Sequence, residues 1–381
     1  MRQASGDASL LRRLNSAAIL RILRGREVAT LTELASAAGV SRPTAEGVVE
    51  DLLADGWVEE YAEDEHADRQ RGRPARRFRF RASSAHVAGV YIDSANLQAM
   101  ACDLGGEVRA VRRQPLPADT PAPERLAAIA ELVRLVAADA ELTVADLAVV
   151  GVGTTGVVDG EGRVVKSIML PGWTGLHLHA ELSARIPVPV VVENDMRLAV
   201  MAEHWRGAAR GCDDVVYLLT GDRIGMGLLI GGRAHRGAHA AAGEIGSQPN
   251  DNWSAFRYVA DYAMAVEPGE LRGSRQSAEF AISRARAGDE KARLAVRRFG
   301  RALAAGLITV VNPLDPEMVV VGGSLSAAGD LLVDPIQELM DEYCLYPPKV
   351  VASGLGGECI TLGAVRLALD HAERLLFTMP D

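Results

Sequence analysis

Cysteine is scarce in this chain of 381 residues. There are four cysteines and no C-x-x-C pair, which argues against a cysteine zinc cage and for reduced thiols in a cytoplasm. No apolar run reaches the roughly 18 residues that a membrane-spanning helix needs, and the N-terminal residues are amphipathic, unlike a signal peptide. Hydrophobic residues at 48% and charged residues at 24% exclude wholesale disorder. We therefore expect a cytoplasmic protein of two or three domains with no membrane segment.

Lysine is also rare, since only Lys166, Lys291 and Lys349 are present. The net charge of −9 argues at first against a nucleic-acid partner. The charges are segregated, however. Residues 1–82 hold 14 basic and 13 acidic residues, which leaves 27 of the 41 basic and 37 of the 50 acidic residues for 83–381. The acidic excess therefore belongs to the second part of the chain.

The first 82 residues show a succession of helix signals. Apolar residues recur at helical spacing up to Gly25. Thr30 and Glu33 then have the spacing of a capping box, which opens a second, short helix. Gly39 supplies the left-handed turn that ends this helix, and Ser41 begins a third.

Two strand patterns follow the third helix, at residues 57–61 and 77–80. Helix, capped helix, tight turn, helix and a two-stranded wing is the order of a winged helix-turn-helix domain. Such a domain places the N-terminal side chains of its recognition helix in the DNA major groove. The alternative is a small helical domain that binds another protein.

Two sets of residues are candidates for DNA contact. At the start of the third helix these are Arg42, Thr44, Ala45 and Glu46. Arg42 has the donors to contact guanine bidentately, and Glu46 can accept from cytosine. Arg71 and Arg73 flank a glycine and precede a proline, which suits insertion into a narrow minor groove.

The remaining residues, 83–381, alternate strands and helices with glycine turns at strand ends. This pattern predicts an α/β fold with mixed sheets. Two such halves are expected, at about 83–195 and 196–381, with a cleft between the two lobes.

Several ordered motifs in this body resemble the ROK family of sugar kinases and sugar-responsive repressors. They are G-V-G-T-T-G at 151–156, L-P-G-W at 170–173, E-N-D at 193–195, A-G-E-I-G at 242–246 and N-P-L-D-P-E at 312–317. The resemblance implies an actin/hexokinase-like body of two lobes around a ligand cleft, assembled as a homodimer or homotetramer. The N-terminal winged helix resembles the repressor branch of the family.

The phosphate loops depart from the kinase pattern that this resemblance implies. In the first phosphate loop, residues 93–97, Asp93 matches the aspartate of the kinase pattern. Ser94 and Ala95, however, stand where glycine lets the backbone approach phosphate. In the second loop, 221–225, Asp222 brings a carboxylate toward phosphate charge, although Arg223 can offset it. We therefore expect no ATP-dependent phosphorylation, no enzyme activity and no cofactor.

The sugar pocket implied by the resemblance is half retained. Asn194, Asp195 and Glu244 stand where the family grips sugar hydroxyls, with the Asp as general base. The alternative for Asn194 and Asp195 is a capping role at the helix that begins near Met196. Ser247 replaces the histidine that follows the A-G-E-I-G motif in the family.

The zinc loop of the family is missing. Residues 248–275 contain no cysteine, so no thiolate site is possible there and no metal is expected. His235 and His239 are read as ordinary loop residues. The ligand is then an unusual sugar, a sugar phosphate, or nothing.

The interpretation is a DNA-binding transcriptional regulator, a repressor of carbohydrate-related genes. Its partners are a double-stranded operator and a sugar or sugar-phosphate effector, and ligand-driven lobe closure would alter the spacing of two winged helices in a dimer. One alternative is an active sugar kinase with an attached DNA-binding domain. Another is a constitutive DNA-binding protein without an effector.

Overall fold

The computed structural model describes residues 3–61, 75–245, 253–270 and 273–377, with side chains from Leu11 onward. Arg71, Arg73 and Ser247 lie outside the described residues, so their expected roles stay predictions. Within the described ranges no helix is long and apolar enough to cross a membrane.

The N-terminal unit is the expected winged helix-turn-helix. Its helices are α1 (Gln3–Arg24), α2 (Leu31–Ala38) and α3 (Arg42–Ala54), and its three-stranded sheet has the order β1 (Ala29–Thr30), β3 (Arg77–Phe80), β2 (Val58–Tyr61). The capping box forms as predicted: the Thr30 backbone N–H donates to the Glu33 carboxylate at 2.7 Å, and the Thr30 hydroxyl accepts from the Glu33 N–H. Gly39 ends α2 at φ +66°, and Ser41 caps α3.

The body contains two five-stranded sheets of the same topology. In the first lobe the order is β10 (Val190–Asn194), β7 (Leu147–Thr154), β4 (His86–Ile92), β5 (Asn96–Asp103), β6 (Val108–Pro115). In the second it is β15 (Lys349–Ala352), β14 (Met318–Gly322), β11 (Val215–Thr220), β12 (Ile224–Ile230), β13 (Arg233–Ala234). Each sheet pairs an antiparallel meander with two parallel strands. A short ribbon, β8 (Val157–Val158) and β9 (Val164–Lys166), follows β7.

Side chains alternate between the two faces of each sheet because successive strand residues point in opposite directions. In β11, Val216 and Leu218 pack toward one side with Phe299, whereas Val215 and Tyr217 pack toward the other with Val200. The helices that cover these faces are α4 (Ala122–Asp139), α5 (Leu178–Ser183), α6 (Asp195–Arg206), α7 (Arg257–Val266), α8 (Ser274–Arg286), α9 (Glu290–Leu314), α10 (Asp330–Tyr343) and α11 (Cys359–Phe377).

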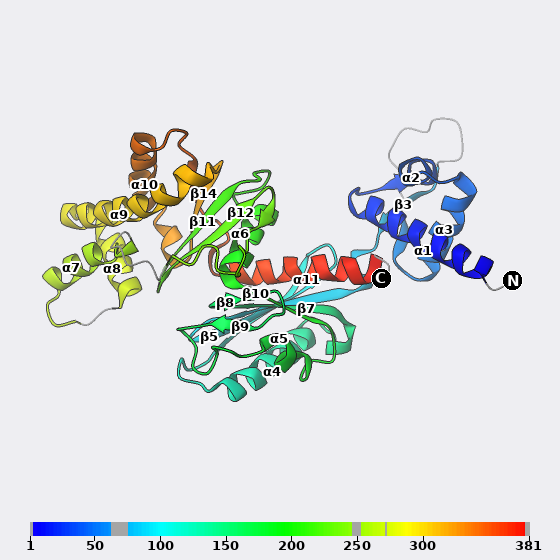
Figure 1. Ribbon diagram of the computed structural model, residues 1–381, viewed down its shortest axis with the longest axis horizontal. Helices are drawn as coiled ribbons and strands as arrows, with labels where there is room; N and C mark the ends of the chain where they lie inside the picture. Colours follow the sequence, from blue (N-terminus) through cyan, green and yellow to red (C-terminus); the bar gives the residue numbers. More distant parts are fainter. Residues whose placement is uncertain (1–2, 62–74, 246–252, 271–272, 378–381) are drawn as a thin grey trace.

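The last helix, α11, departs from the predicted lobe division. It was expected in the lobe 196–381, but it packs against β4 and β7 of the first lobe and against α6 (Figure 1). Glycines allow the close approach: a Cβ at Gly151 would lie 2.1 Å from the Ala364 carbonyl oxygen, and one at Gly363 would lie 2.0 Å from that of Leu198. The chain therefore returns to its first lobe before it ends.

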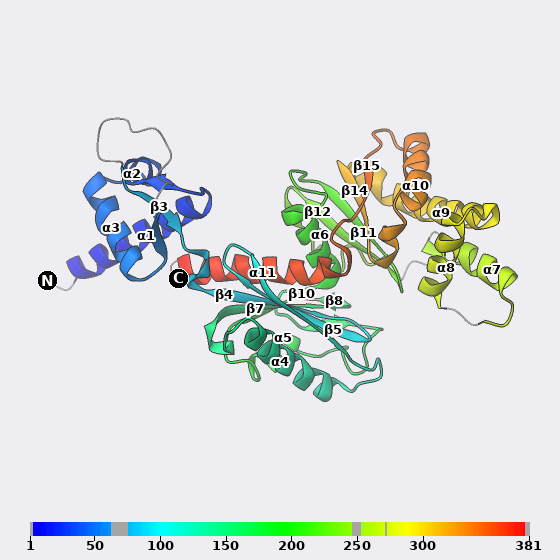
Figure 2. The same cartoon turned by 180° about the vertical axis from the view of Figure 1, so that it is seen from behind.

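Figure 2 shows that α11 runs from the region between the lobes to the winged helix-turn-helix domain. Its 19 residues span about 28 Å at 1.5 Å per residue. This helix is therefore in a position to touch both the cleft and the N-terminal domain.

Candidate functional site

The exposed start of α3 is the candidate DNA-binding face. Arg42, Thr44 and Glu46 are exposed there, as a major-groove contact requires. Ala45 is fully buried and packs in the core of the domain, so its predicted DNA contact is wrong. Its position in the helical repeat places its methyl group inward, between the exposed Thr44 and Glu46.

The wing strands carry paired charges in the part of the wing that the structure describes. Arg76 contacts the Glu60 carboxylate at 3.0 Å, and Arg79 pairs with Glu59. These pairs offset part of the positive charge of β3. The exposed Arg42 on α3 is therefore the better candidate for a base contact.

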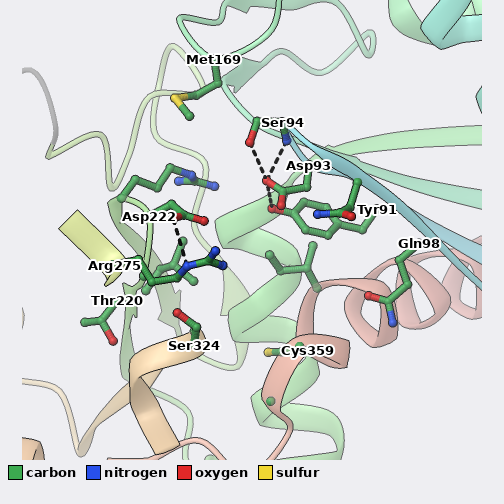
Figure 3. A pocket seen from close by; sticks show the side chains of 18 of the residues that line it. Tyr91, Asp93, Ser94, Gln98, Met169, Thr220, Asp222, Arg275, Ser324 and Cys359 are labelled. Carbon is green, nitrogen blue, oxygen red and sulfur yellow. Dashed lines mark hydrogen bonds and ion pairs between the residues drawn. The ribbon is translucent and has the colours of Figure 1, made fainter. Parts of the chain in front are cut away.

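The cleft between the lobes holds two compartments. The Tyr91 compartment, about 450 Å³, is lined among others by Tyr91, Asp93, Ser94 and Arg275 (Figure 3). The Glu244 compartment, about 420 Å³, is lined by residues that include Asn194, Asp195 and Glu244. The structure thus brings together the three predicted sugar-contacting residues that it describes.

Asp195 is fully buried at the start of α6. One of its carboxylate oxygens accepts from the Asn194 amide at 3.1 Å, and the other is paired with the guanidinium of Arg223. Burial raises the pKa of Asp195 to about 6, with Arg223 acting in the opposite direction. The expected general base is therefore engaged by an arginine of the facing lobe.

Asn194 caps α6, as the capping alternative predicts. Its side-chain oxygen accepts from the backbone N–H groups of Met196 and Arg197, and its amide nitrogen donates to the Gly156 carbonyl and to Asp195. All four hydrogen-bonding positions of this amide are occupied by protein groups. A direct sugar contact of Asn194 stays a prediction.

A buried ion pair stabilises the start of α6. The Arg197 Nε donates to Glu193 at 2.6 Å, and both side chains are nearly inaccessible. The Arg197 guanidinium also donates to the carbonyls of Ala240 and Val158 at 3.0 and 2.8 Å. This network ties β8 and the 236–245 segment to α6. Sequence reasoning did not single out Arg197, because Glu193 lies in β10, outside the helix, and their contact depends on how the strand leads into α6.

The Tyr91 compartment contains both altered phosphate loops. The backbone N–H of Ser94 donates to Asp93 at 2.8 Å, and the side chains of Ser94 and Asn96 line the cavity. On the opposite wall, Arg275 Nε lies 3.2 Å from the Asp222 carboxylate (Figure 3). Side chains thus occupy the space in which a phosphate cradle would have only backbone.

Trp253 and Phe256 line the Glu244 compartment, and sequence reasoning did not single them out. The Trp253 ring packs against Gly306 of α9, where a Cβ would lie 3.0 Å from it. In the described part of the chain no group of three or more His, Cys, Asp or Glu side chains is placed to hold a metal ion. Because residues 246–252 fall outside that part, the expected absence of zinc stays a prediction.

The far end of α11 contacts the N-terminal domain. Arg24, the last residue of α1, donates to Glu373 on α11 at 2.7 Å and to the Leu104 carbonyl at 3.3 Å. At its other end, Cys359 and Ile360 of α11 line the Tyr91 compartment. A single helix therefore joins the cleft to the winged helix-turn-helix domain.

Comparisons with known proteins agree with this two-part architecture. The xylose repressor of Caldicellulosiruptor bescii is 20% identical over 396 residues, covering 96% of this chain and 97% of the relative. A glucokinase of Thermotoga maritima is 28% identical over 57% of this chain and 78% of its own. A solved ROK-family transcriptional regulator, a homologue of the E. coli MLC protein, matches 97% of this chain and 99% of its own with a TM-score of 0.76 at 20% identity.

A further solved relative, a ROK glucokinase from Streptomyces griseus in complex with glucose and AMPPNP, covers 75% of this chain and 100% of its own with a TM-score of 0.63 at 27% identity. The sequence model of the IclR helix-turn-helix domain matches residues 14–61, and that of the ROK family matches residues 87–371. Both predictions, the N-terminal helix-turn-helix and the kinase-like body, are confirmed. The chain belongs to the ROK family.

Proposed function

We propose that this protein is a transcriptional repressor that binds an operator through its winged helix-turn-helix and senses a carbohydrate in its interlobe cleft. The observation that carries the proposal is the path of α11. Its first residues line the cleft, and its Glu373 pairs with Arg24 of the DNA-binding domain. A ligand that favours one arrangement of the lobes would shift the population of domain positions through this helix.

The DNA-binding half of the proposal rests on the exposed start of α3. Arg42 presents a planar donor pair suited to guanine, and Glu46 an acceptor suited to cytosine. Pairing of two such domains in a dimer would make the operator a pseudo-palindrome, because half-site spacing follows protein symmetry. The xylose repressor and the solved MLC-like regulator, both matched along nearly the whole chain, support this assignment.

The kinase alternative is disfavoured by the cleft itself. Asp195, the expected general base, is buried and paired with Arg223, and Asp222 brings a second carboxylate to the phosphate side. The Asp222 carboxylate lies 3.2 Å from Arg275 on this wall, so a nucleotide phosphate placed here would have to compete with Asp222 for that arginine. We infer that the body has kept the fold of a sugar kinase for ligand sensing.

Selection of bound duplexes from a random DNA library with the full-length protein tests the proposed function. We expect one enriched pseudo-palindromic site, and loss of discrimination at one base pair of each half-site in Arg42→Ala, by about 1–3 kcal/mol. Arg21→Ala, an exposed arginine on α1, serves as the matched control. Absence of any enriched sequence would contradict the proposal.

A further inference from the structure

Arg223 forms the wall between the two compartments of the cleft. It lies in the turn between β11 and β12 of the second lobe, and Asp222, Arg223 and Met169 line both compartments. Its guanidinium crosses to Asp195 of the first lobe, where it is paired with a carboxylate that has no exposed surface. This is an ion pair between lobes, at the point where they face each other.

The local structure is built to admit this arginine. At Gly225, two residues further along, a Cβ would lie 2.9 Å from the Arg223 guanidinium and 2.6 Å from the Met196 sulfur. Any larger residue would therefore crowd the guanidinium. The Tyr91 hydroxyl also interacts with Arg223, and burial together with Asp195 and Asp93 raises the pKa of Tyr91. The guanidinium is thus paired with Asp195 of α6 and lies near the Tyr91 hydroxyl of β4, which itself donates to Asp93 at 3.5 Å.

The two compartments differ in charge. The Tyr91 compartment is lined by three arginines, Arg113, Arg223 and Arg275, against two carboxylates, Asp93 and Asp222. The Glu244 compartment has the opposite balance, with Asp195, Asp222 and Glu244 against Lys166 and Arg223. Each of the three arginines is also paired with a carboxylate, Arg113 with Glu358, Arg223 with Asp195 and Arg275 with Asp222, so an anionic ligand would bind in the Tyr91 compartment by taking the place of one of these partners. The carboxylates of the Glu244 compartment suit hydroxyl donors.

A second observation points to a ligand on the arginine side. The Nε atom of Arg275 is shielded from solvent and makes no hydrogen bond in the described part of the chain, although the side chain as a whole is 43% exposed and Nε lies 3.2 Å from the Asp222 carboxylate and 3.7 Å from that of Glu279. Its side chain is aimed into the cavity (Figure 3). A buried donor without an acceptor costs free energy, which an anionic ligand oxygen would recover.

We propose that Arg223 is a selectivity switch and that the effector is a sugar carrying an acid group, which spans both compartments. This inference rests on the proposed function. The anionic group binds Arg223 and Arg275 in the Tyr91 compartment. Arg223 then leaves Asp195, and the freed carboxylate, with Glu244, accepts the sugar hydroxyls. A neutral sugar supplies no partner for Arg223, and displacing this arginine from Asp195 would leave a charge poorly compensated.

Isothermal titration of the full-length protein with paired ligands tests this switch. The probes are glucose, glucose 6-phosphate, N-acetylglucosamine, its 6-phosphate, and glucuronate, with inorganic phosphate alone as the bare anion. We expect one phosphorylated or carboxylated sugar to bind about 10- to 100-fold more tightly than its neutral parent, the range for a charge-assisted contact. The phosphate and uronate arms distinguish the two sources of the acid group.

Three variants separate the switch from the fold. In Arg223→Gln the preference for the charged sugar over its neutral parent collapses, and in Arg223→Lys part of it returns. Arg275→Gln weakens the charged sugar and leaves the Arg223–Asp195 pair in place. Arg297→Gln, an exposed arginine on α9 paired with Glu338, is the matched control and changes neither affinity. Circular dichroism and melting temperature report whether each variant is folded.

Each contrary result has a distinct meaning. If wild type binds a neutral sugar as tightly as its phosphate, or if the preference survives in Arg223→Gln, the switch is refuted while a sugar-responsive repressor stands. If no probe binds wild type or Arg223→Gln, the switch and the sugar-sensing part of the proposed function both fall. Operator selection, which needs no ligand, still decides the DNA-binding part.

Discussion

Replacement of Arg197 by methionine is the most demanding test of how the site is built. Arg197 is 2% exposed and pairs with Glu193, which is 5% exposed. Its guanidinium also donates a hydrogen bond to the carbonyl of Ala240. Ala240 has a left-handed φ of +57°, which residues other than glycine rarely adopt. Methionine keeps much of the side-chain volume and removes every one of these hydrogen bonds.

The expected loss follows from the partners left behind. Removing one member of a buried ion pair typically costs about 3–5 kcal/mol, because the remaining charge stays buried. Arg236 also contacts Glu193 and is 43% exposed, so the carboxylate keeps a solvent-screened partner. Two buried carbonyls, of Val158 and Ala240, lose their donors, at about 1 kcal/mol or more each. We therefore expect a total of about 3–5 kcal/mol.

Urea unfolding measures this loss, followed by far-ultraviolet circular dichroism and tryptophan fluorescence, with coincidence of the two signals as the check on two-state behaviour. Arg185→Met is a matched control: it breaks the Glu181–Arg185 pair, which has the same i,i+4 spacing but is exposed. Such a pair contributes about 0.3–0.5 kcal/mol. Equal losses in the two variants would refute the claim that the buried network supports the site.

Three further results are expected. The Asp195 pKa, raised by burial from 3.8 to about 6, means that the native state binds a proton more tightly than the unfolded state. The contribution of this group to stability therefore falls as pH rises from about 4 to about 6. The difference in the free energy of unfolding between wild type and Asp195→Asn, measured in urea at several pH values, should show this slope. A difference that does not change with pH contradicts it. Glu373→Gln should lower stability by at most about 1 kcal/mol, since both partners are partly exposed, yet weaken operator release by the effector; unchanged release in an anisotropy titration would exclude this contact from the coupling. Coupled-enzyme assays should find no sugar-dependent ATP hydrolysis, and turnover that disappears in Asp195→Asn would revive the kinase alternative.

Local signals in the sequence predicted the helices and the two wing strands of the N-terminal domain, but not its short first strand, β1. The capping box at Thr30 and Glu33 and the left-handed Gly39 mark helix ends by interactions within a few residues, which sequence spacing records directly. The burial of Ala45 could not be predicted, because small residues occur on either face of a helix. Its burial depends on what packs against that face.

Contacts between distant segments could not be predicted in the same way. The return of α11 to the first lobe depends on which sheet its glycine-containing face fits, and chain order favours the nearer lobe. The pairing of Arg223 with Asp195 joins residues of opposite lobes. From the sequence, Arg223 could be recognised only as a cation beside a phosphate loop, whereas its actual partner is the residue expected to be the general base.

The affinity of the effector measured with and without operator DNA tests the central claim most directly. If a ligand in the cleft lowers operator affinity by a given factor, linkage requires that saturating operator lower the affinity for that ligand by the same factor. Using the sugar that the titrations identify, we predict a shift of about 5- to 150-fold, the usual range of allosteric coupling. An effector dissociation constant that is the same with free and operator-bound protein would show that the cleft and the DNA-binding domain are not coupled, and would contradict the account.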